Sequence, residues 1–123
     1  MNFGQLKMYI DGELVSSVNN VTKEIYSPLN DERIATLSWA NSLDSERALK
    51  SAEEGFDTWS KTPVKKRKEW MLLLRDKILE KEEILRKSIS YEMGKPYGAT
   101  AEDIESITNS CLLYTSPSPR DTA

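Results

Sequence analysis

The stretch that decides the fold runs from Ser42 to Pro96. It contains two segments, SLDSERALKSAEEGFDTWSK (42–61) and VKKRKEWMLLLRDKILEKEEILRKSISYEM (64–93), separated by Thr62-Pro63 and closed by Gly94-Lys95-Pro96. Apolar residues recur in both at steps of three and four, which places them on one face of a helix. These residues are Leu49, Ala52, Phe56 and Trp59 in the first segment and Met71, Leu74, Ile78, Leu85, Ile89 and Met93 in the second. We therefore predict two amphipathic helices whose apolar faces require a core.

The boundaries of these helices are also predictable. Ser42 is a candidate N-cap, and Pro63 suits the first turn of a restarted helix because its missing N–H would be unpaired there anyway. Gly94 is the expected stop of the second helix. Since 64–93 is about eight turns long, we expect a kink or a docking role on a larger body.

The residues before Ser42 have the pattern of β structure. Leu6–Val15 predicts a hairpin, because Asp11-Gly12 between apolar residues suits a tight turn with positive φ. Val21–Tyr26 is a second extended segment that ends at Ser27-Pro28. After a turn, residues 33–40 alternate like a strand. The sequence thus predicts a hairpin and a strand, followed by two or three long helices.

Beyond Pro96 the sequence predicts a short helix and then a change of character. Thr100 and Asp103 resemble a capping box that opens a third helix with Ile104 and Ile107 on its apolar side. From Cys111 there is no periodicity, and two Ser-Pro steps follow. One interpretation is a disordered native tail. The one we favour is that Cys111–Asp121 resembles the in-frame translation of a transposase-end adapter used in sequencing libraries, so that residues 111–123 are not native.

Composition excludes several functional classes. The chain has 123 residues, 30% charged and 38% hydrophobic, which is typical of a soluble domain. Its net charge of -3 offers no global field for nucleic acid or an anionic membrane. It has no histidine and one cysteine, which excludes an internal disulfide and a multi-cysteine metal site. Without a secretory signal pattern at the N-terminus, we expect a cytoplasmic location.

Other patterns have a functional and a structural interpretation, and the structural one is favoured each time. The basic run 65–68 lacks interleaved aromatic residues and is typical of a solvated helix face. Gly94-Lys95 lacks the remainder of a phosphate-binding loop. The acidic residues of 102–105 diverge around a helix. Arg67 is a possible anchor for an anion, but a structural salt bridge is the preferred role. Trp39, Trp59 and Trp70 are interpreted as packing anchors.

Several segments, in this order, resemble the N-terminal part of the aldehyde dehydrogenase superfamily. The resemblance covers about residues 6–110. The order and spacing of the matching segments together are more specific to the family than any one segment. Its segments are Met8–Glu13, Tyr26–Glu32, a helix with Ala48, Ala52, Phe56 and Trp59, then Arg67 and a leucine-rich helix ending in Glu92-Met93-Gly94-Lys95-Pro96. The resemblance implies that residues 1–110 are an α+β fragment of an α/β, Rossmann-like cofactor-binding domain.

The resemblance also implies a chemistry for the parent protein. Such enzymes oxidise an aldehyde to a carboxylic acid with NAD or NADP, through a cysteine thioester that a glutamate-activated water hydrolyses. The parent is expected to be a homo-oligomer that takes an aldehyde substrate, with no nucleic-acid or membrane partner. In the family the reacting residues lie further along the chain than this sequence reaches. We therefore assign no catalytic, cofactor-binding or metal residue, and we expect this chain to be inactive and to bind no cofactor.

A second hypothesis remains open at this stage. The chain could be a complete small α+β interaction module that presents its long amphipathic helix to a partner groove. No binding motif in the sequence supports that alternative.

Overall fold

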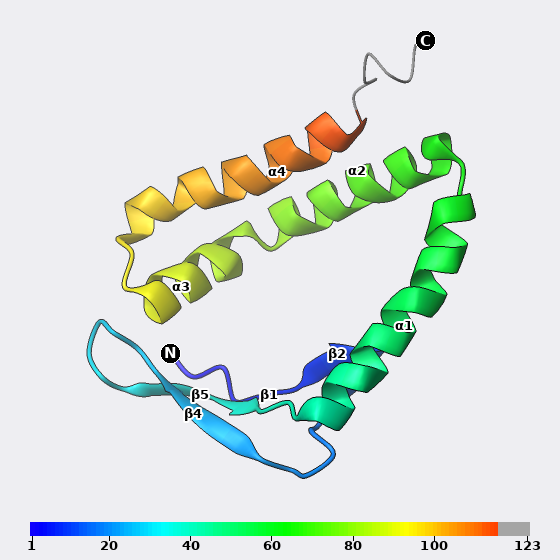
Figure 1. The fold of residues 1–123 in the computed structure, drawn as a ribbon. Helices are drawn as coiled ribbons and strands as arrows, with labels where there is room; N and C mark the ends of the chain where they lie inside the picture. Colours follow the sequence, from blue (N-terminus) through cyan, green and yellow to red (C-terminus); the bar gives the residue numbers. More distant parts are fainter. Residues whose placement is uncertain (116–123) are drawn as a thin grey trace. The chain divides into compact units, whose positions relative to one another are not determined.

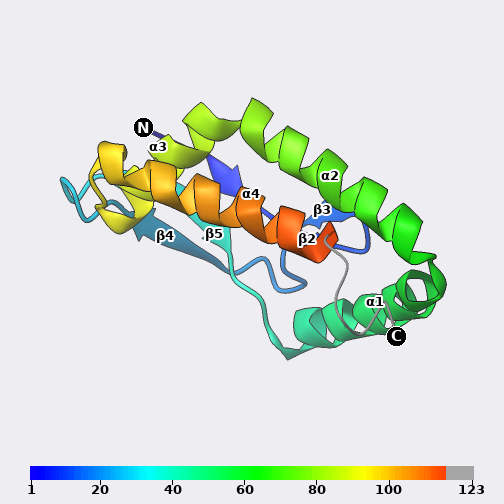
Figure 2. The ribbon, with the colours of Figure 1, turned by 90° about the horizontal axis from the view of Figure 1, so that it is seen from above.

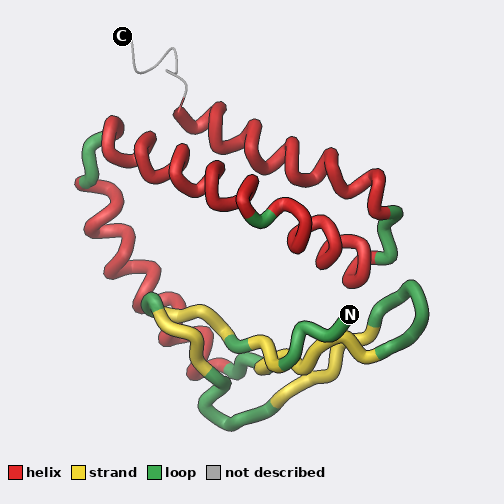
Figure 3. Tube along the Cα trace, turned by 180° about the vertical axis from the view of Figure 1, so that it is seen from behind, coloured by secondary structure: helices red, strands yellow, loops and turns green. Residues whose placement is uncertain are grey.

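The computed structural model describes residues 1–115, so the predicted tail is described only for Cys111–Thr115. The chain divides into two compact units. The first comprises Met1–Lys61 and Tyr91–Gly94, and the second Thr62–Ser90 and Lys95–Ala123. Strands occur before residue 39 and helices follow from residue 42 on (Figure 3), as the sequence predicts.

The first unit contains a three-stranded sheet of order β1-β5-β4. β4 (Thr22–Tyr26) runs antiparallel to β5 (Arg33–Ser38) and lies beside it (Figure 2). β1 (Gln5–Leu6) pairs in parallel with β5, with Gln5 opposite Thr36. The two predicted strands are confirmed, although β5 ends two residues earlier than predicted. β1 was not predicted, because two residues are too few to show a period.

The predicted hairpin is confirmed. β2 (Met8–Ile10) pairs antiparallel with β3 (Glu13–Val15) across a two-residue turn. Asp11 and Gly12 have φ values of 55° and 78°, the positive values that such a turn requires. Ile10 is buried, and β2 contacts the following helix, α1 (Ser42–Lys61).

The prediction that Ser42 caps α1 is wrong by one residue. The Asn41 side chain accepts a hydrogen bond from Asp44 N at 3.0 Å, and the Asp44 carboxylate accepts one from Asn41 N at 3.0 Å. This reciprocal pair is a capping box with asparagine and aspartate in the two positions. An Asn side chain caps a helix as well as a Ser side chain does, so residue type alone does not show that Asn41, directly before Ser42, is the cap.

The Asp44 carboxylate also ties the connection after β3 to the start of α1. It accepts hydrogen bonds from Ser17 Oγ at 2.6 Å and from Val18 N at 3.1 Å, and the residue is only 1% exposed. The hydrogen bond from Ser17, followed by that from the Asn41 backbone, holds the pKa of Asp44 below its ordinary value. The Arg47 guanidinium, 3.9 Å away, acts in the same direction.

The apolar face of α1 is not covered. Leu49 and Phe56 are 66% and 68% exposed, and Trp59 is also exposed. The predicted helix is therefore present. The described residues, however, do not supply a core that covers its apolar face. Trp39 and Trp70 are exposed as well, so the prediction that the three tryptophans are packing anchors is wrong within residues 1–115.

The second unit is helical, and its long helix is broken as predicted. α2 (Val64–Glu80) and α3 (Glu82–Met93) meet at Lys81, whose N–H bonds to the carbonyls of Ile78 and Leu79 instead of one four residues back. Figure 3 shows this short non-helical stretch between the two helices. The charged residues on the outer side of the two helices are exposed: Lys77, Glu80, Lys81, Glu83 and Lys87.

A 3-10 helix, η1 (Tyr97–Thr100), leads into α4 (Ala101–Thr115), which packs antiparallel beside α2 (Figure 1). Ile104 and Cys111 are buried, whereas Ile107 is exposed, so only one of the two predicted apolar residues packs. The helix continues past Ser110 without a break. The origin of the residues from Cys111 on stays a prediction, and Ser116–Ala123 lie outside the described residues.

The predicted capping box at Thr100 is replaced by a different arrangement. Thr100 Oγ1 donates to Tyr97 O at 2.6 Å and accepts from Arg86 Nε at 3.1 Å. Arg86 also donates to Tyr97 O, and its guanidinium lies 4.4 Å from the centre of the Tyr97 ring. One arginine thus holds η1 against α3.

Gly94 ends α3 as predicted, and its conformation is specific. Its φ is +73°, and a Cβ added there would lie 3.2 Å from Pro28 Cγ. Nearby, Ser27 Oγ donates to Tyr91 O at 2.6 Å, which satisfies a carbonyl in the last turn of α3. The turn after β4 and the end of α3 are therefore fitted closely within the first unit.

We expect Gly94→Ala to destabilise the chain by about 1–2 kcal/mol, because an L-residue is strained at this φ and its Cβ crowds Pro28. Gly55→Ala, in α1 with nothing near its Cβ, is the matched control and should stabilise by about 0.5–1 kcal/mol. Urea midpoints followed by circular dichroism measure both. Equal shifts for the two variants would contradict the assignment.

At acidic pH, Asp44 should no longer contribute to the free energy of unfolding. Because its folded pKa is lowered, this contribution is complete above the ordinary carboxyl pKa of about 4 and declines as pH falls through the lower folded value. Asp44→Asn should be less stable at neutral pH and should lose part of the acid dependence. Urea midpoints across a pH series test this, with the exposed Asp57→Asn as control. An unchanged acid limb in Asp44→Asn would refute it.

The uncovered apolar residues predict the thermal behaviour of the 123-residue chain. With few apolar side chains buried, we expect a broad transition and aggregation on heating. Calorimetry and light scattering measure both. A sharp two-state transition of a compact monomer is the result that this prediction does not allow.

Candidate functional site

Within residues 1–115, no group of neighbouring side chains has the composition of a catalytic centre. Residues 1–115 contain no cluster of three or more His, Cys, Asp or Glu side chains that could hold a metal ion. The single cysteine, Cys111, is 4% exposed and lies within α4, where a substrate cannot reach its sulfur. Within the same residues, no helix is long and apolar enough to cross a membrane.

The resolved pKa shifts do not indicate acid–base chemistry. The hydrogen bond that Tyr26 donates to Glu24 raises the pKa of Tyr26, and the one that Lys77 donates to Glu80 raises the pKa of Lys77. A hydrogen bond from Lys87 lowers the pKa of Glu83. Each shift moves the group away from neutral pH, whereas a general acid or base needs a pKa close to it.

The structure brings together two of the sequence candidates, Lys95 and Asp103. Lys65, Lys66, Arg67 and Lys68 lie at the start of α2. Lys95 follows the end of α3 and pairs with Asp103 at 2.8 Å, so its ammonium is engaged in an ion pair. Glu102 and Glu105, on the same helix as Asp103, are exposed.

Arg67 does not form the salt bridge that we predicted. Within residues 1–115 no carboxylate pairs with it, and its Nε atom is buried without a hydrogen-bond partner. A buried N–H group without an acceptor is uncommon in folded proteins and costs about 1–3 kcal/mol. The described residues therefore leave the Nε of Arg67 without an acceptor.

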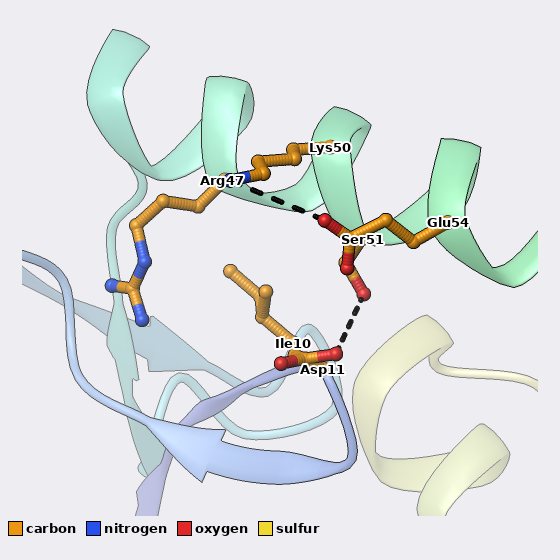
Figure 4. Close-up of a pocket in the computed structure, with 6 residues that line it drawn as sticks. All are labelled: Ile10, Asp11, Arg47, Lys50, Ser51 and Glu54. Carbon is orange, nitrogen blue, oxygen red and sulfur yellow. Dashed lines mark hydrogen bonds and ion pairs between the residues drawn. The ribbon is translucent and has the colours of Figure 1, made fainter.

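Two hollows occur in the first unit. The one in Figure 4, of about 200 Å³, lies between the hairpin turn and α1. Its polar groups satisfy one another: Ser51 Oγ lies 3.4 Å from Asp11 Oδ1, and Lys50 Nζ lies 4.0 Å from Glu54 Oε1. The other hollow, of about 120 Å³, is mainly apolar and is lined by Phe3, Leu6, Ile25, Ile34, Ala35, Leu37 and Glu92. Neither presents a converging set of unsatisfied groups that would orient a substrate.

The glycines do not form a dinucleotide cradle. Such a cradle needs a glycine-rich turn between a parallel strand and a helix, where free N–H groups face the diphosphate. Gly12 lies in the hairpin turn, Gly55 inside α1 and Gly94 at the end of α3. Gly4 precedes β1 and Gly98 lies in η1. Within residues 1–115 the glycines therefore do not supply such a cradle.

Sequence reasoning missed two residues that organise the structure. Asp44 was not predicted to be part of the helix cap, although Asn41 three residues earlier already gave the spacing of a capping box. The role of Arg86 could not be predicted from local sequence, because it donates hydrogen bonds to Tyr97 and Thr100, more than ten residues further along the chain.

Comparison with known proteins identifies the origin of this arrangement. The Aldehyde dehydrogenase family matches residues 15–122. Malonate-semialdehyde dehydrogenase 2 of Bacillus cereus is 36% identical over 92 residues, which are 75% of this chain and 19% of the relative. Malonate-semialdehyde dehydrogenase 1 of Geobacillus thermodenitrificans is 33% identical over 100 residues, 81% of this chain and 21% of the relative. This chain thus spans about a fifth of the length of these relatives.

Solved structures agree with the sequence comparison. A betaine aldehyde dehydrogenase from Staphylococcus aureus in complex with NAD+ matches with a TM-score of 0.84 and 31% identity, over 92% of this chain and 26% of that one. A 3,6-anhydro-L-galactose dehydrogenase in complex with NAP matches with a TM-score of 0.82 and 28% identity, over 85% and 22%. The strands followed by helices are thus those of part of a Rossmann-like domain. This chain belongs to the aldehyde dehydrogenase family.

Proposed function

We propose that this chain is the N-terminal part of an NAD(P)-dependent aldehyde dehydrogenase whose full length oxidises an aldehyde to a carboxylic acid. Family membership over residues 15–122 carries this proposal. The named neighbours are aldehyde dehydrogenases, two of them in complex with a nicotinamide dinucleotide. The relatives' names include a carboxylated and a cationic aldehyde. We therefore propose aldehydes as the substrate class and assign no particular aldehyde.

The 123-residue chain itself is proposed to be inactive and to bind no cofactor. Support comes from the burial of Cys111 and from glycines that do not form a dinucleotide cradle. The parent is proposed to be a cytoplasmic homo-oligomer without nucleic-acid or membrane partners. These statements about the parent follow from the family alone.

Residues 1–110 are proposed to be native and residues 111–123 to come from an adapter. The support is the match of eleven consecutive residues, Cys111–Asp121, to one reading frame of the adapter. Sequencing independent clones across the Ser110 codon tests this. We expect different codons after Ser110 and, further on, a glycine-rich turn and a cysteine. Genomic DNA that encodes Cys111–Ala123 followed by a stop codon would contradict it.

We expect no aldehyde-dependent formation of NADH or NADPH by the purified 123-residue chain. The longer reading frame, expressed in the same way, should give that activity, because it would supply the cysteine and the cofactor turn. The measurement is absorbance of the reduced cofactor with a panel of aldehydes. Activity of the short chain that disappears in Cys111→Ser would overturn the proposed inactivity.

A further inference from the structure

The pair Asp11-Gly12 in the hairpin turn has the composition that favours rearrangement of a peptide bond. It is the one place in the sequence where a glycine follows an aspartate or an asparagine. The amide nitrogen that follows an aspartate can attack the carbon of that residue's own side-chain carboxyl group. A glycine at the second position leaves this approach open, because it has no Cβ and few conformational limits.

The structure leaves both reacting groups of this pair accessible. Asp11 and Gly12 are exposed, and among the described residues no hydrogen bond engages the Gly12 N–H. A Cβ added at Gly12 would meet nothing within 4 Å. The Asp11 carboxylate accepts a hydrogen bond from Ser51 Oγ at 3.4 Å, close to the limit of such a bond (Figure 4). Little therefore restrains either group when the turn opens.

The hairpin is small enough to open readily. β2 and β3 have three residues each, and a two-stranded hairpin of this size is only marginally stable in water. Tyr9 and Leu14 lie opposite each other on these strands and are 72% and 67% exposed, so this pair contributes little buried apolar area. Opening of the hairpin therefore needs less free energy than unfolding of the first unit as a whole.

Asp44-Ser45 provides a contrast within the same unit. Asp44 is 1% exposed, and its carboxylate accepts hydrogen bonds from Ser17, Val18 and Asn41. The Ser45 N–H donates to Asn41 O at 3.0 Å, so its nitrogen is engaged in the first turn of α1. Both groups that would have to react are therefore held in place, and we expect no rearrangement at Asp44 in the folded chain.

We propose that Asp11 is a site of spontaneous isomerisation to isoaspartate, a modification whose only co-reactant is water. The Gly12 nitrogen loses its proton and bonds to the Asp11 carboxyl carbon, whose hydroxyl group leaves with that proton as water. The product is a five-membered succinimide ring. A second water molecule adds to the ring carbonyl that came from the main chain and breaks its bond to the Gly12 nitrogen. The main chain then runs through the former side-chain carbonyl, and the mass is unchanged.

The isoaspartyl chain cannot re-form the original turn. Its main chain is longer by one methylene group, whereas the two-residue turn with its positive φ values sets the pairing of Ile10 with Glu13. Ile10 is one of the few buried apolar residues, and β2 contacts α1. Isomerisation therefore displaces the hairpin from α1 and lowers the stability of the first unit.

Peptide mapping of the aged chain tests the site. The purified 123-residue chain and a synthetic peptide of residues 8–23 are kept side by side at mildly acidic pH and physiological temperature. Trypsin cleaves after Lys7 and Lys23 and so releases the same segment from the chain. We expect a second chromatographic peak of this segment with identical mass, which fragmentation locates at Asp11. Deamidation of an asparagine in the segment would instead raise the mass. The tryptic peptide 34–47, which contains Asp44, should show no such peak.

Stability measurements test the structural consequence. The isoaspartyl chain, separated by chromatography, should have a lower urea midpoint than the chain before ageing. Asp11→Glu is the matched control, because its ring would have six members and forms far more slowly, so its own midpoint should not fall on ageing. The proposal is overturned if residues 8–23 stay unmodified in the chain while the free peptide converts. Equal conversion at Asp44, or an unchanged midpoint of the isoaspartyl chain, would overturn it as well.

Discussion

The Asp44 carboxylate accepts hydrogen bonds from Ser17, Val18 and Asn41, and the first unit depends on it. It closes the first turn of α1 and at the same time fixes the connection that follows the hairpin. Other polar ties act similarly: Ser27 bonds to the end of α3, and Arg86 holds η1. Few apolar residues are buried; among the described residues they are Ile10, Ile34, Ala35, Ile104 and Cys111. Directional polar contacts therefore hold the units together beside these few apolar side chains, and they fix the local geometry.

Much of the fold follows from local sequence. The hairpin turn at Asp11-Gly12, the end of α3 at Gly94 and the break near Lys81 are set by backbone preferences that a few residues carry. Burial does not follow in this way. Periodicity identifies Phe56 and Leu74 as members of an apolar face, but whether that face is covered depends on segments far away in the sequence. The predicted roles of the tryptophans and of Arg67 failed for the same reason: residues 1–115 do not bury the three rings, and they supply no carboxylate for Arg67.

The absence of predicted site residues and the family assignment have one common explanation. Hairpin, strands and helices of this kind are scaffold, whereas reacting residues of an enzyme are collected from several segments along the chain. The resemblance was recognisable from the order of weak segments, and the match over residues 15–122 agrees with it. Chemistry could not be recognised in the same way, since no two of the candidate groups converge on one cavity among the described residues.

The buried Cys111 has a practical consequence. It is the only thiol in the chain, and it lies in α4 where that helix packs beside α2. A thiol reagent can react with it only when this helix pair opens, so the rate of labelling measures the local opening equilibrium of the second unit. The chain thus contains its own chemical reporter, and it reports on one helix pair without any added probe.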